Sequence, residues 1–269
     1  MKGQTLKEAF SSIFAGAVIV LCFIAAYLIY VNIMGNPVNF EGGNPKGHPI
    51  PGNYLGTIYK GGPIVPILIT VNLVLLTFIF ERFIMLSRAK GKGNINAFVR
   101  KLQMLLNEDK IDEASVLCDK NRGSLANVIK SGLHRYRDLQ QDKALQNDQK
   151  VLALQKDLEE ATALELPVLS KNLVIMSTIA SISVLIGLIG TVLGMIRAFT
   201  ALAQAGAPDA LALSTGISEA LINTAFGITG STLAILFYNY FSSRIDSMTF
   251  KMDEANFSLT QTFASSLKK

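Results

Sequence analysis

Residues 183–196 read Ser-Val-Leu-Ile-Gly-Leu-Ile-Gly-Thr-Val-Leu-Gly-Met-Ile, and they lie in a longer stretch, 173–203, whose single charge is Arg197. About 20 apolar residues suffice for a helix to cross a bilayer. Such a segment must be helical, because unpaired backbone groups find no water in lipid. The stretch therefore predicts a membrane-spanning helix. Three further stretches predict spans of the same kind: 13–34, 63–86 and 216–241.

The composition also favours a membrane protein. Half of the 269 residues are hydrophobic and 17% are charged, against about 25% charged in ordinary soluble domains. The net charge of +5 does not indicate nucleic acid, because Lys and Arg gather beside the apolar stretches rather than along one basic stripe. The stretch 13–34 is longer than a signal-peptide core and lacks a small-residue cleavage pattern, so we expect a permanent anchor.

The positive charges predict the orientation. Lys and Arg collect at one end of every stretch, which places both termini in the cytoplasm if the cytoplasmic side holds the positive charge. The resulting segments are a cytoplasmic N-terminus (1–12), an extra transmembrane helix (13–34), a periplasmic loop (35–62), a second span (63–86), a cytoplasmic helical domain (87–172), a third span (173–203), a periplasmic connection (204–215), a fourth span (216–241) and a cytoplasmic C-terminal helix (242–269). The fold class is thus an all-α polytopic membrane protein with long helices extending into a cytoplasmic helical domain.

The segment 87–172 has helical periodicity. Six apolar residues share one face after a cap at Asn94 or Asn96: Ile95, Phe98, Val99, Leu102, Leu105 and Leu106. We expect further helices over 111–120, over 124–137 and from 143 onward, with breaks at Gly123 and Asp138. The last of these is expected to run into the third span with a kink at Pro167. The short connection 204–215, which carries Pro208, predicts that the third and fourth spans form a hairpin.

Small residues recur at helical spacing in the last two spans. Such stripes let helices approach closely. They are interpreted as helix-packing positions: Ser183, Gly187, Gly190 and Gly194 in the third span, and Gly216, Ala220, Gly227 and Ser231 in the fourth. The pattern predicts tight packing, and it leaves open whether the helices that meet belong to one chain or to several copies.

Four polar residues of these spans are candidates for an ion path: Thr191, Thr224, Asn223 and Glu219. Hairpin geometry allows the two threonines to reach similar depth, although a membrane threonine usually bonds back to its own helix. Glu219 is either an intramembrane functional acid or a charge that stabilises the beginning of its helix. Arg197 lies near the outer end of its span and can snorkel, and Glu81 with Arg82 marks the inner interface.

Several kinds of site have no support in the sequence. The middle of the spans holds no Asp, Glu, His or Lys, so a proton carrier would have to come from another chain. His48 and His134 are isolated, and the two cysteines, Cys22 and Cys118, indicate neither a disulfide framework nor a metal site. No nucleotide-binding or hydrolase motif is present. We therefore expect no enzyme, no metal and no cofactor.

Two motifs resemble the MotA/TolQ/ExbB proton-channel family, and within it the ExbB and TolQ branch. The first is Leu-Ile-Gly-Leu-Ile-Gly-Thr-Val-Leu-Gly-Met-Ile over 185–196, followed by Phe199. The second is Gly-Ile-Ser-Glu-Ala-Leu over 216–221, followed by Thr-Ala-Phe-Gly over 224–227 and the closing Tyr-Asn at 238–239. The resemblance covers about 63–241 and is strongest over 183–239.

The resemblance implies a subunit of a motor driven by the proton-motive force in the bacterial inner membrane. It implies a homopentamer whose third and fourth spans line a lumen around a single-span ExbD/TolR-like partner, whose Asp accepts the proton. On this pattern Thr191 and Thr224 face the lumen, and Glu219 matches the acidic position of the second motif. The work would reach outer-membrane transport through a TonB-like protein.

The alternatives within the family are TolQ-like envelope maintenance and a MotA-like flagellar or gliding stator. A non-conducting membrane scaffold is the alternative of a different class, while the small number of spans argues against a secondary transporter. The chain departs from the family pattern at Leu233, where a proline is common, and in the extra span 13–34.

Overall fold

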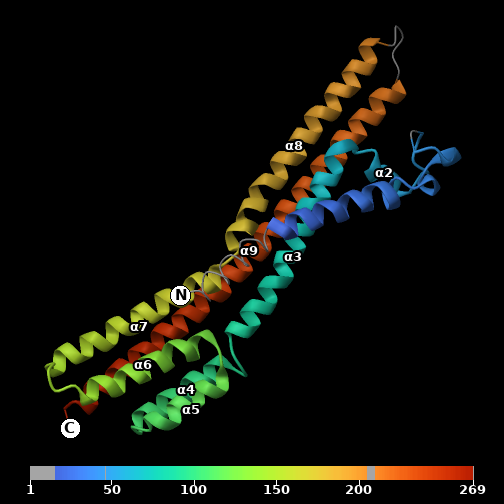
Figure 1. The fold of residues 1–269 in the computed structure, drawn as a ribbon. Helices are drawn as coiled ribbons and strands as arrows, with labels where there is room; N and C mark the ends of the chain where they lie inside the picture. The colour runs from blue at the N-terminus through green and yellow to red at the C-terminus, as the bar shows by residue number, and fades with distance from the viewer. Residues whose placement is uncertain (1–15, 46, 205–209, 269) are drawn as a thin grey trace. The chain divides into compact units, whose positions relative to one another are not determined.

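The computed structural model describes residues 16–45, 47–204 and 210–268 (Figure 1). The expected segment 1–12 and residues 205–209 of the expected connection, with Pro208, lie outside the described residues. The chain divides into two compact units. Unit 1 comprises Met1–Phe80 and Val174–Tyr238, and unit 2 comprises Glu81–Leu173 and Asn239–Lys269.

The described residues are helical and contain no strand, which confirms the all-α prediction. An isolated antiparallel bridge pairs Phe40 with Pro49. Four helices are long and apolar enough to cross a membrane, as expected: Gly16–Met34, Gly62–Ala89, Asn147–Thr200 and Leu213–Ser266.

Unit 1 contains the first helix, most of α3 and α8, and the first part of α9. The named elements have these bounds: η1 Ile29–Met34, η2 Pro37–Asn39, η3 Glu41–Gly43, α2 Tyr54–Tyr59, η4 Gly62–Ile64, α3 Val65–Ala89, α8 Leu173–Gln204 and α9 Ala210–Ser266. The connection between the first helix and α3 folds onto that helix, because Tyr30 stacks on Tyr59 at a ring-centroid distance of 4.6 Å and donates a 3.1 Å hydrogen bond to its carbonyl.

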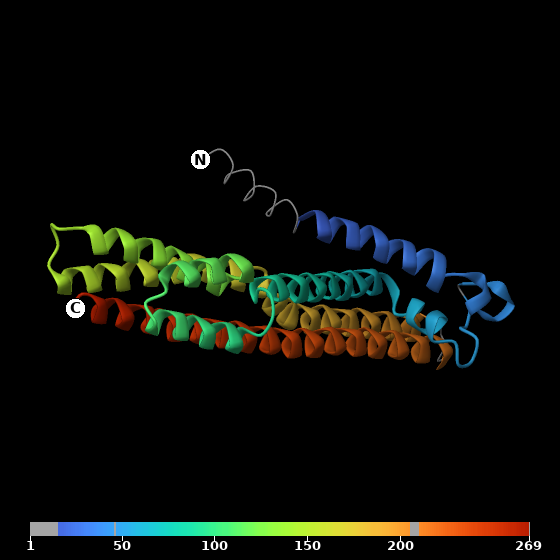
Figure 2. The same ribbon diagram turned by 90° about the horizontal axis from the view of Figure 1, so that it is seen from below.

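Unit 2 is a bundle of α4 Ile95–Asn107, α5 Ile111–Asn121, α6 Ser124–Gln141 and α7 Asn147–Ser170 with the last part of α9. Figures 1 and 2 show α6 and α7 beside that part of α9. The core forms where their apolar faces meet: Tyr136 of α6 and Phe263 of α9 are both fully buried, with ring centroids 4.7 Å apart. A Cβ at Gly132 would stand 2.9 Å from Leu259, so this glycine lets α6 approach α9 closely.

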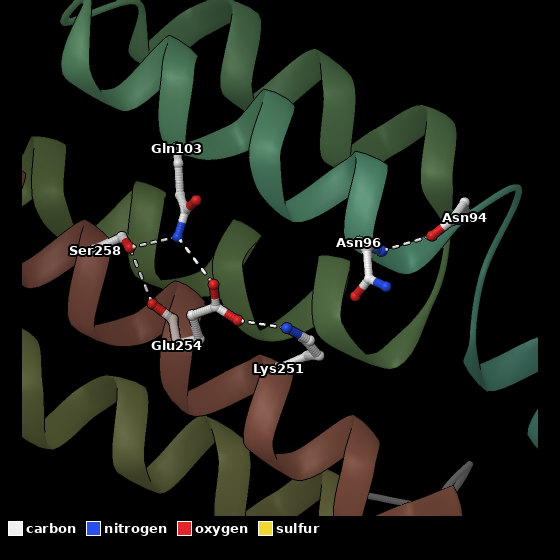
Figure 3. Close-up of polar contacts among 6 residues, drawn as sticks. All are labelled: Asn94, Asn96, Gln103, Lys251, Glu254 and Ser258. Atoms are coloured by element: carbon white, nitrogen blue, oxygen red, sulfur yellow. Dashed lines mark hydrogen bonds and ion pairs between the residues drawn. The ribbon is translucent and has the colours of Figure 1, made fainter.

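The predicted face and cap of α4 are confirmed. Five of its six apolar residues are buried, and Ile95 is half-buried. The Asn94 side chain accepts a 2.9 Å hydrogen bond from the backbone N–H of Asn96 (Figure 3). On the side facing α9, Gln103 Nε2 donates to Ser258 Oγ at 3.1 Å and to Glu254 Oε1 at 3.4 Å.

The expected break at Asp138 is wrong, while the one at Gly123 is confirmed. α6 continues to Gln141 because Leu139 is buried in the bundle, and the helix ends at Asp142, whose N–H bonds to the carbonyl of Asp138. The next helix begins later than residue 143, at the capping box formed by Gln146 and Gln149.

α7 runs on through Pro167 to Ser170 as expected, but it does not continue into α8, because Lys171 and Asn172 separate the two helices. Lys171 is then extended, with ψ 139°, and Asn172 is left-handed, with φ 64°, before α8 begins at Leu173. Asparagine is one of the few residues that adopt the left-handed region readily, so the break between α7 and α8 falls at Lys171 and Asn172 rather than at the proline.

Candidate functional site

The small residues of α8 and α9 pack against each other in unit 1. A Cβ added to Gly187 would stand 2.9 Å from the carbonyl oxygen of Asn223 and 3.1 Å from the Cα of Gly227. A Cβ at Gly216 would stand 3.0 Å from the Cα of Ala198. These are backbone atoms, which cannot move aside as the end of a side chain can. Of the two readings that the sequence left open, the structure shows the stripes packed within one chain.

The rest of the stripe completes the same helix pair. A Cβ at Gly194 would stand 3.0 Å from the backbone nitrogen of Ala220. Ser231 donates a 2.5 Å hydrogen bond from its hydroxyl to the carbonyl of Ala180. Ser183 is fully buried, and among the described residues its hydroxyl has no hydrogen-bond partner. Small polar residues therefore join α8 to α9 by close contact and by hydrogen bonds across the pair.

The two candidate threonines meet between these helices. The hydroxyls of Thr191 and Thr224 are hydrogen-bonded to each other, so the expectation of equal depth is confirmed. The hydroxyl of Thr191 also lies 3.1 Å from the carbonyl of Gly187 and 3.3 Å from that of Ala220. That of Thr224 lies 3.3 Å from the Ala220 carbonyl. Each threonine thus contacts a carbonyl of its own helix in addition to the other threonine.

This hydroxyl pair, Thr191 with Thr224, has more acceptors than hydrogens. Each hydroxyl donates one hydrogen and accepts up to two, whereas four contacts lie within reach. The two hydroxyl hydrogens can make only two of these four contacts as hydrogen bonds at once. Rotation of the hydrogens therefore changes which oxygen accepts a hydrogen bond without moving either helix. Such an arrangement can present a donor or an acceptor to an ionisable group beside it.

A shallow apolar groove of about 670 Å³ opens beside Thr191. Its other walls come from the same helix: Val192, Met195, Ile196, Phe199, Thr200 and Ala203. Val192, Ile196 and Phe199 are all more than half exposed. The face of α8 that does not pack on α9 is therefore open along the groove, with Thr191 at its edge.

Asn223 contacts the first connection instead of the hydroxyl pair. Its side chain is fully buried, and Nδ2 donates a 2.9 Å hydrogen bond to the carbonyl of Gly61. Oδ1 has no partner among the described residues. Gly190 makes room for this side chain, because a Cβ there would stand 2.6 Å from the Asn223 Cβ.

Glu219 forms an ion pair with Arg197. The Glu219 side chain is 8% exposed and that of Arg197 is 46% exposed. Gly62, with φ 76°, lies against the pair, since a Cβ there would stand 2.9 Å from Arg197 Nη1. Burial lowers the pKa of Lys60, and the nearby charge of Glu219 opposes this shift in part. Glu219 is therefore paired with Arg197 and lies close to Lys60 and Gly62 of the first connection.

The sequence interpretation missed the role of Arg82 in unit 2. This side chain is fully buried, pairs with Glu81 through two 2.6 Å hydrogen bonds, and donates from Nη1 to the carbonyl of Leu169 at 3.1 Å. The sequence offered one indication of this buried pair: Glu81 and Arg82 are adjacent opposite charges near the end of an apolar stretch. Glu219 and Arg197 gave a similar one, as opposite charges near the same end of two antiparallel spans.

The fold and the site together define a class of protein. Four apolar helices are long enough to cross a membrane, and two of them are joined by glycines around a hydroxyl pair. Among the described residues no group of three or more His, Cys, Asp and Glu is placed to hold a metal ion. The protein is a polytopic helical membrane protein whose candidate site is built from hydroxyls, an amide and one ion pair.

The comparison with protein families identifies the family. Residues 121–254 match the model of the MotA/TolQ/ExbB proton channel family. The chain belongs to this family through that region, which includes the hydroxyl pair, Asn223 and Glu219.

Named relatives match over shorter regions. The biopolymer transport protein ExbB-like 3 of Synechocystis sp. is 41% identical over 88 residues, which are 32% of this chain and 42% of the relative. The Tol-Pal system protein TolQ of Haemophilus influenzae is 38% identical over 93 residues, 35% of this chain and 40% of the relative. TolQ of Pseudomonas aeruginosa is 30% identical over 117 residues, 44% of this chain and 51% of the relative. The chain thus matches about half or less of the length of each of these relatives.

Proposed function

We propose that this chain is the channel-forming subunit of a motor driven by the proton-motive force in the bacterial inner membrane. Five copies surround the transmembrane helix of an ExbD/TolR-like partner, whose Asp accepts the proton. Both termini and the bundle of unit 2 lie in the cytoplasm, where the positive charges at the ends of the spans belong. The motor energises outer-membrane transport through a TonB-like protein.

The hydroxyl pair carries this proposal. It lies within the region that matches the proton channel family, and its hydrogens can turn between several acceptors. The spans contain no acid at that depth, so the carboxylate that loads and releases the proton comes from the partner. The groove beside Thr191 is the surface on which the partner helix would lie.

The copies are proposed to meet through the aliphatic faces of α8 and α9 and not through the small residues. The opposite helix of the same chain already occupies the space beside the glycines of both stripes. The exposed residues that remain outside the groove are large and apolar, among them Leu185, Leu188 and Ile189 of α8 and Leu221 and Ile228 of α9. Packing between copies would cover these residues, in place of lipid.

The energetics favour a cycle that uses several protons. One charge that crosses a potential of 100 mV releases about 2.3 kcal/mol, so work on an outer-membrane load of larger free energy requires more than one proton. Protonation of the partner's Asp changes its charge within the pentamer. The partner helix then turns or rocks, because a neutral and a charged carboxyl favour different positions along the threonine-lined wall.

Proton flux tests the proposal directly. The double variant Thr191→Val, Thr224→Val removes both hydroxyls and keeps the side-chain shape. In proteoliposomes that contain this chain and its single-span partner, flux through the double variant should fall about tenfold or more. A hydrogen bond to a charged group contributes about 1.5–3 kcal/mol, and the hydroxyls would make such bonds to the partner's Asp.

A matched control removes two other hydroxyls from the same helices. Thr178 and Thr229 bond back to the carbonyls of Val174 and Ala225 at 2.8 and 2.7 Å, and neither lines the groove, so Thr178→Val, Thr229→Val should conduct as the unchanged chain does. Size-exclusion profiles must show the same assembly for all three proteins. Unchanged flux in the Thr191, Thr224 variant would refute the threonine path, and absence of flux in the unchanged complex would indicate a non-conducting scaffold.

Envelope maintenance of the TolQ type is the second candidate. Two relatives that match this chain over 93 and 117 residues are Tol-Pal system proteins. The load distinguishes the two candidates. Affinity purification of the whole complex from its own membrane should recover a TonB-like protein on the first proposal and a TolA-like protein on the second, whereas a peptidoglycan-binding partner would indicate a stator.

A further inference from the structure

Unit 2 contains a pocket of about 270 Å³ that none of the functional arguments above uses. It lies between the last turns of α3, the beginning of α4 at Ile95 and the stretch of α9 from Tyr240 to Met248. Its lining combines three kinds of group: two cations, two serine hydroxyls and an apolar wall. That combination, in one small pocket, indicates an amphiphilic ligand.

The charged side of the pocket is purely cationic. Lys90 and Arg244 line it, and no carboxylate does. Among the described residues neither cation takes part in an ion pair, and Arg244 lies over the ring of Tyr240 at 5.4 Å. Ser87 and Ser247 add two hydroxyl donors to the lining. These groups suit a phosphate, whose oxygens accept hydrogen bonds from cations and hydroxyls.

The apolar side is aromatic. The ring of Phe83 lies 5.7 Å from that of Tyr240 and 5.0 Å from that of Phe241. Phe83 and Tyr240 are each 42% exposed, although both are large and apolar. Aromatic residues gather where the hydrocarbon of a membrane meets the headgroups. A free inorganic anion would gain nothing from such a wall, whereas an acyl chain would.

The position along the chain also fits a lipid. The apolar stretches that predict the second and fourth spans end at residues 86 and 241, and the pocket is lined by residues on both sides of these two ends. Lys90 and Arg244 therefore lie just beyond the hydrocarbon, while Phe83 lies just within it. Basic pockets at this depth bind the headgroups of anionic lipids.

We propose that this pocket binds an anionic phospholipid. The phosphate lies between Lys90 and Arg244, with the hydroxyls of Ser87 and Ser247 as further donors, and the first part of an acyl chain follows Phe83 and Tyr240. The site requires membrane insertion of the chain, and it is independent of whether the chain conducts protons.

Native mass spectrometry of the purified full-length protein tests this site. The protein is reconstituted in nanodiscs that contain equal amounts of phosphatidylglycerol and phosphatidylcholine, then released, and its retained lipids are counted. The unchanged protein should retain phosphatidylglycerol in preference. Each basic residue near the surface contributes roughly a fivefold preference for anionic lipid, so Lys90→Gln, Arg244→Gln should reduce the preference about 20- to 30-fold.

A charge-matched control decides whether the pocket itself binds the lipid. Arg100 and Lys101 are exposed on α4 and do not line the pocket, so Arg100→Gln, Lys101→Gln should retain the lipid. The charge-preserving variant Lys90→Arg, Arg244→Lys should retain it as well. Equal loss in the Arg100, Lys101 control would overturn the proposal, because the effect would then be one of net charge.

Two measurements on the unchanged protein keep the proposal open to refutation if a variant misfolds. No preference for phosphatidylglycerol over phosphatidylcholine would overturn it. Glycerol 3-phosphate supplies the same phosphate without the acyl chains, and we expect that it does not displace the lipid at millimolar concentration. Displacement by glycerol 3-phosphate would identify the site as one for a soluble anion instead.

Discussion

Gly227 shows at the scale of a single residue how α8 and α9 are joined. A Cβ at this position would stand 2.7 Å from the carbonyl oxygen of Ser183 and 2.9 Å from the Cα of Gly187. Both are backbone atoms of the opposite helix, so the two helices would have to separate. Overpacking of this kind costs about 1–3 kcal/mol, which exceeds the helix propensity that alanine gains over glycine.

We predict that Gly227→Ala lowers the free energy of unfolding by up to about 2 kcal/mol, the overpacking cost less the helix propensity that alanine gains, measured by titration with a denaturing detergent. Gly16→Ala is the matched control in another apolar helix, because nothing lies within 4 Å of a Cβ at Gly16, and it should not lower stability. Equal stability of the two variants would show that α8 and α9 do not pack as closely as described.

Cys118 provides a prediction about pH. Burial raises the pKa of this thiol from 9.0 to about 12, with Asp119 acting in the same direction. The thiol therefore stays protonated in the folded protein, and its contribution to stability is present below pH 9 and lost as the pH rises toward 12. Because maleimides react with the thiolate, labelling at pH 8 should be roughly a thousandfold slower than that of an ordinary thiol.

The labelling experiment has a control on the same helix. Val116 is 52% exposed, so Val116→Cys in a chain that carries Cys118→Ala should react at the ordinary rate, with Cys22→Ser in both proteins. Rapid labelling of Cys118 in the folded protein at pH 8 would contradict its burial in unit 2.

At the scale of helices, Arg82 links α3 to α7. Its guanidinium is fully buried, with Glu81 on one side and the carbonyl of Leu169 on the other. Removal of one member of a buried pair leaves the other charge poorly compensated, which costs about 3–5 kcal/mol. Glu81 is 22% exposed, so the lower end of that range applies.

Arg82→Ala should therefore destabilise the protein by about 3 kcal/mol, detected as earlier loss of helical circular dichroism during denaturant titration. Arg88→Ala removes an exposed arginine from the last turn of the same helix and should change stability by about 0.5 kcal/mol or less. A similar small effect for Arg82→Ala would mean that its buried contacts are not maintained in the membrane protein.

The sequence predicted the helices well where one physical rule determined them. Apolar length gave the four long helices, and periodicity with a cap gave α4 from Asn94 onward. Errors arose where tertiary contacts decide, as at Leu139, whose burial carries α6 past Asp138. The break at Asn172 depends on a left-handed backbone, which proline-based reasoning at position 167 does not reveal.

The candidate site was predictable in part for the same reason. Hairpin geometry brought Thr191 and Thr224 to one depth, which the structure confirms. The sequence did not show that Asn223 reaches Gly61 or that Gly62 lies against the ion pair of Glu219, because these contacts join segments far apart in the chain. The sequence also could not show whether the small-residue stripes pack within one chain or between copies, whereas the structure shows them packed within one chain.

At the scale of the whole molecule, family membership indicates a proton channel, while among the described residues no carboxylate is hydrogen-bonded to the hydroxyl pair. The glycines of α8 and α9 pack against each other within the chain, so the proposed assembly would use the aliphatic faces that the two helices leave exposed. The proposed proton transfer therefore requires several copies of the chain and a second polypeptide that brings the carboxylate.

The mass of the complex extracted in native lipid tests this requirement most directly. We expect five copies of the 29.1 kDa chain, together with a co-purified single-span protein that carries an intramembrane Asp. A monomer in native lipid, with no such protein bound, would contradict the account.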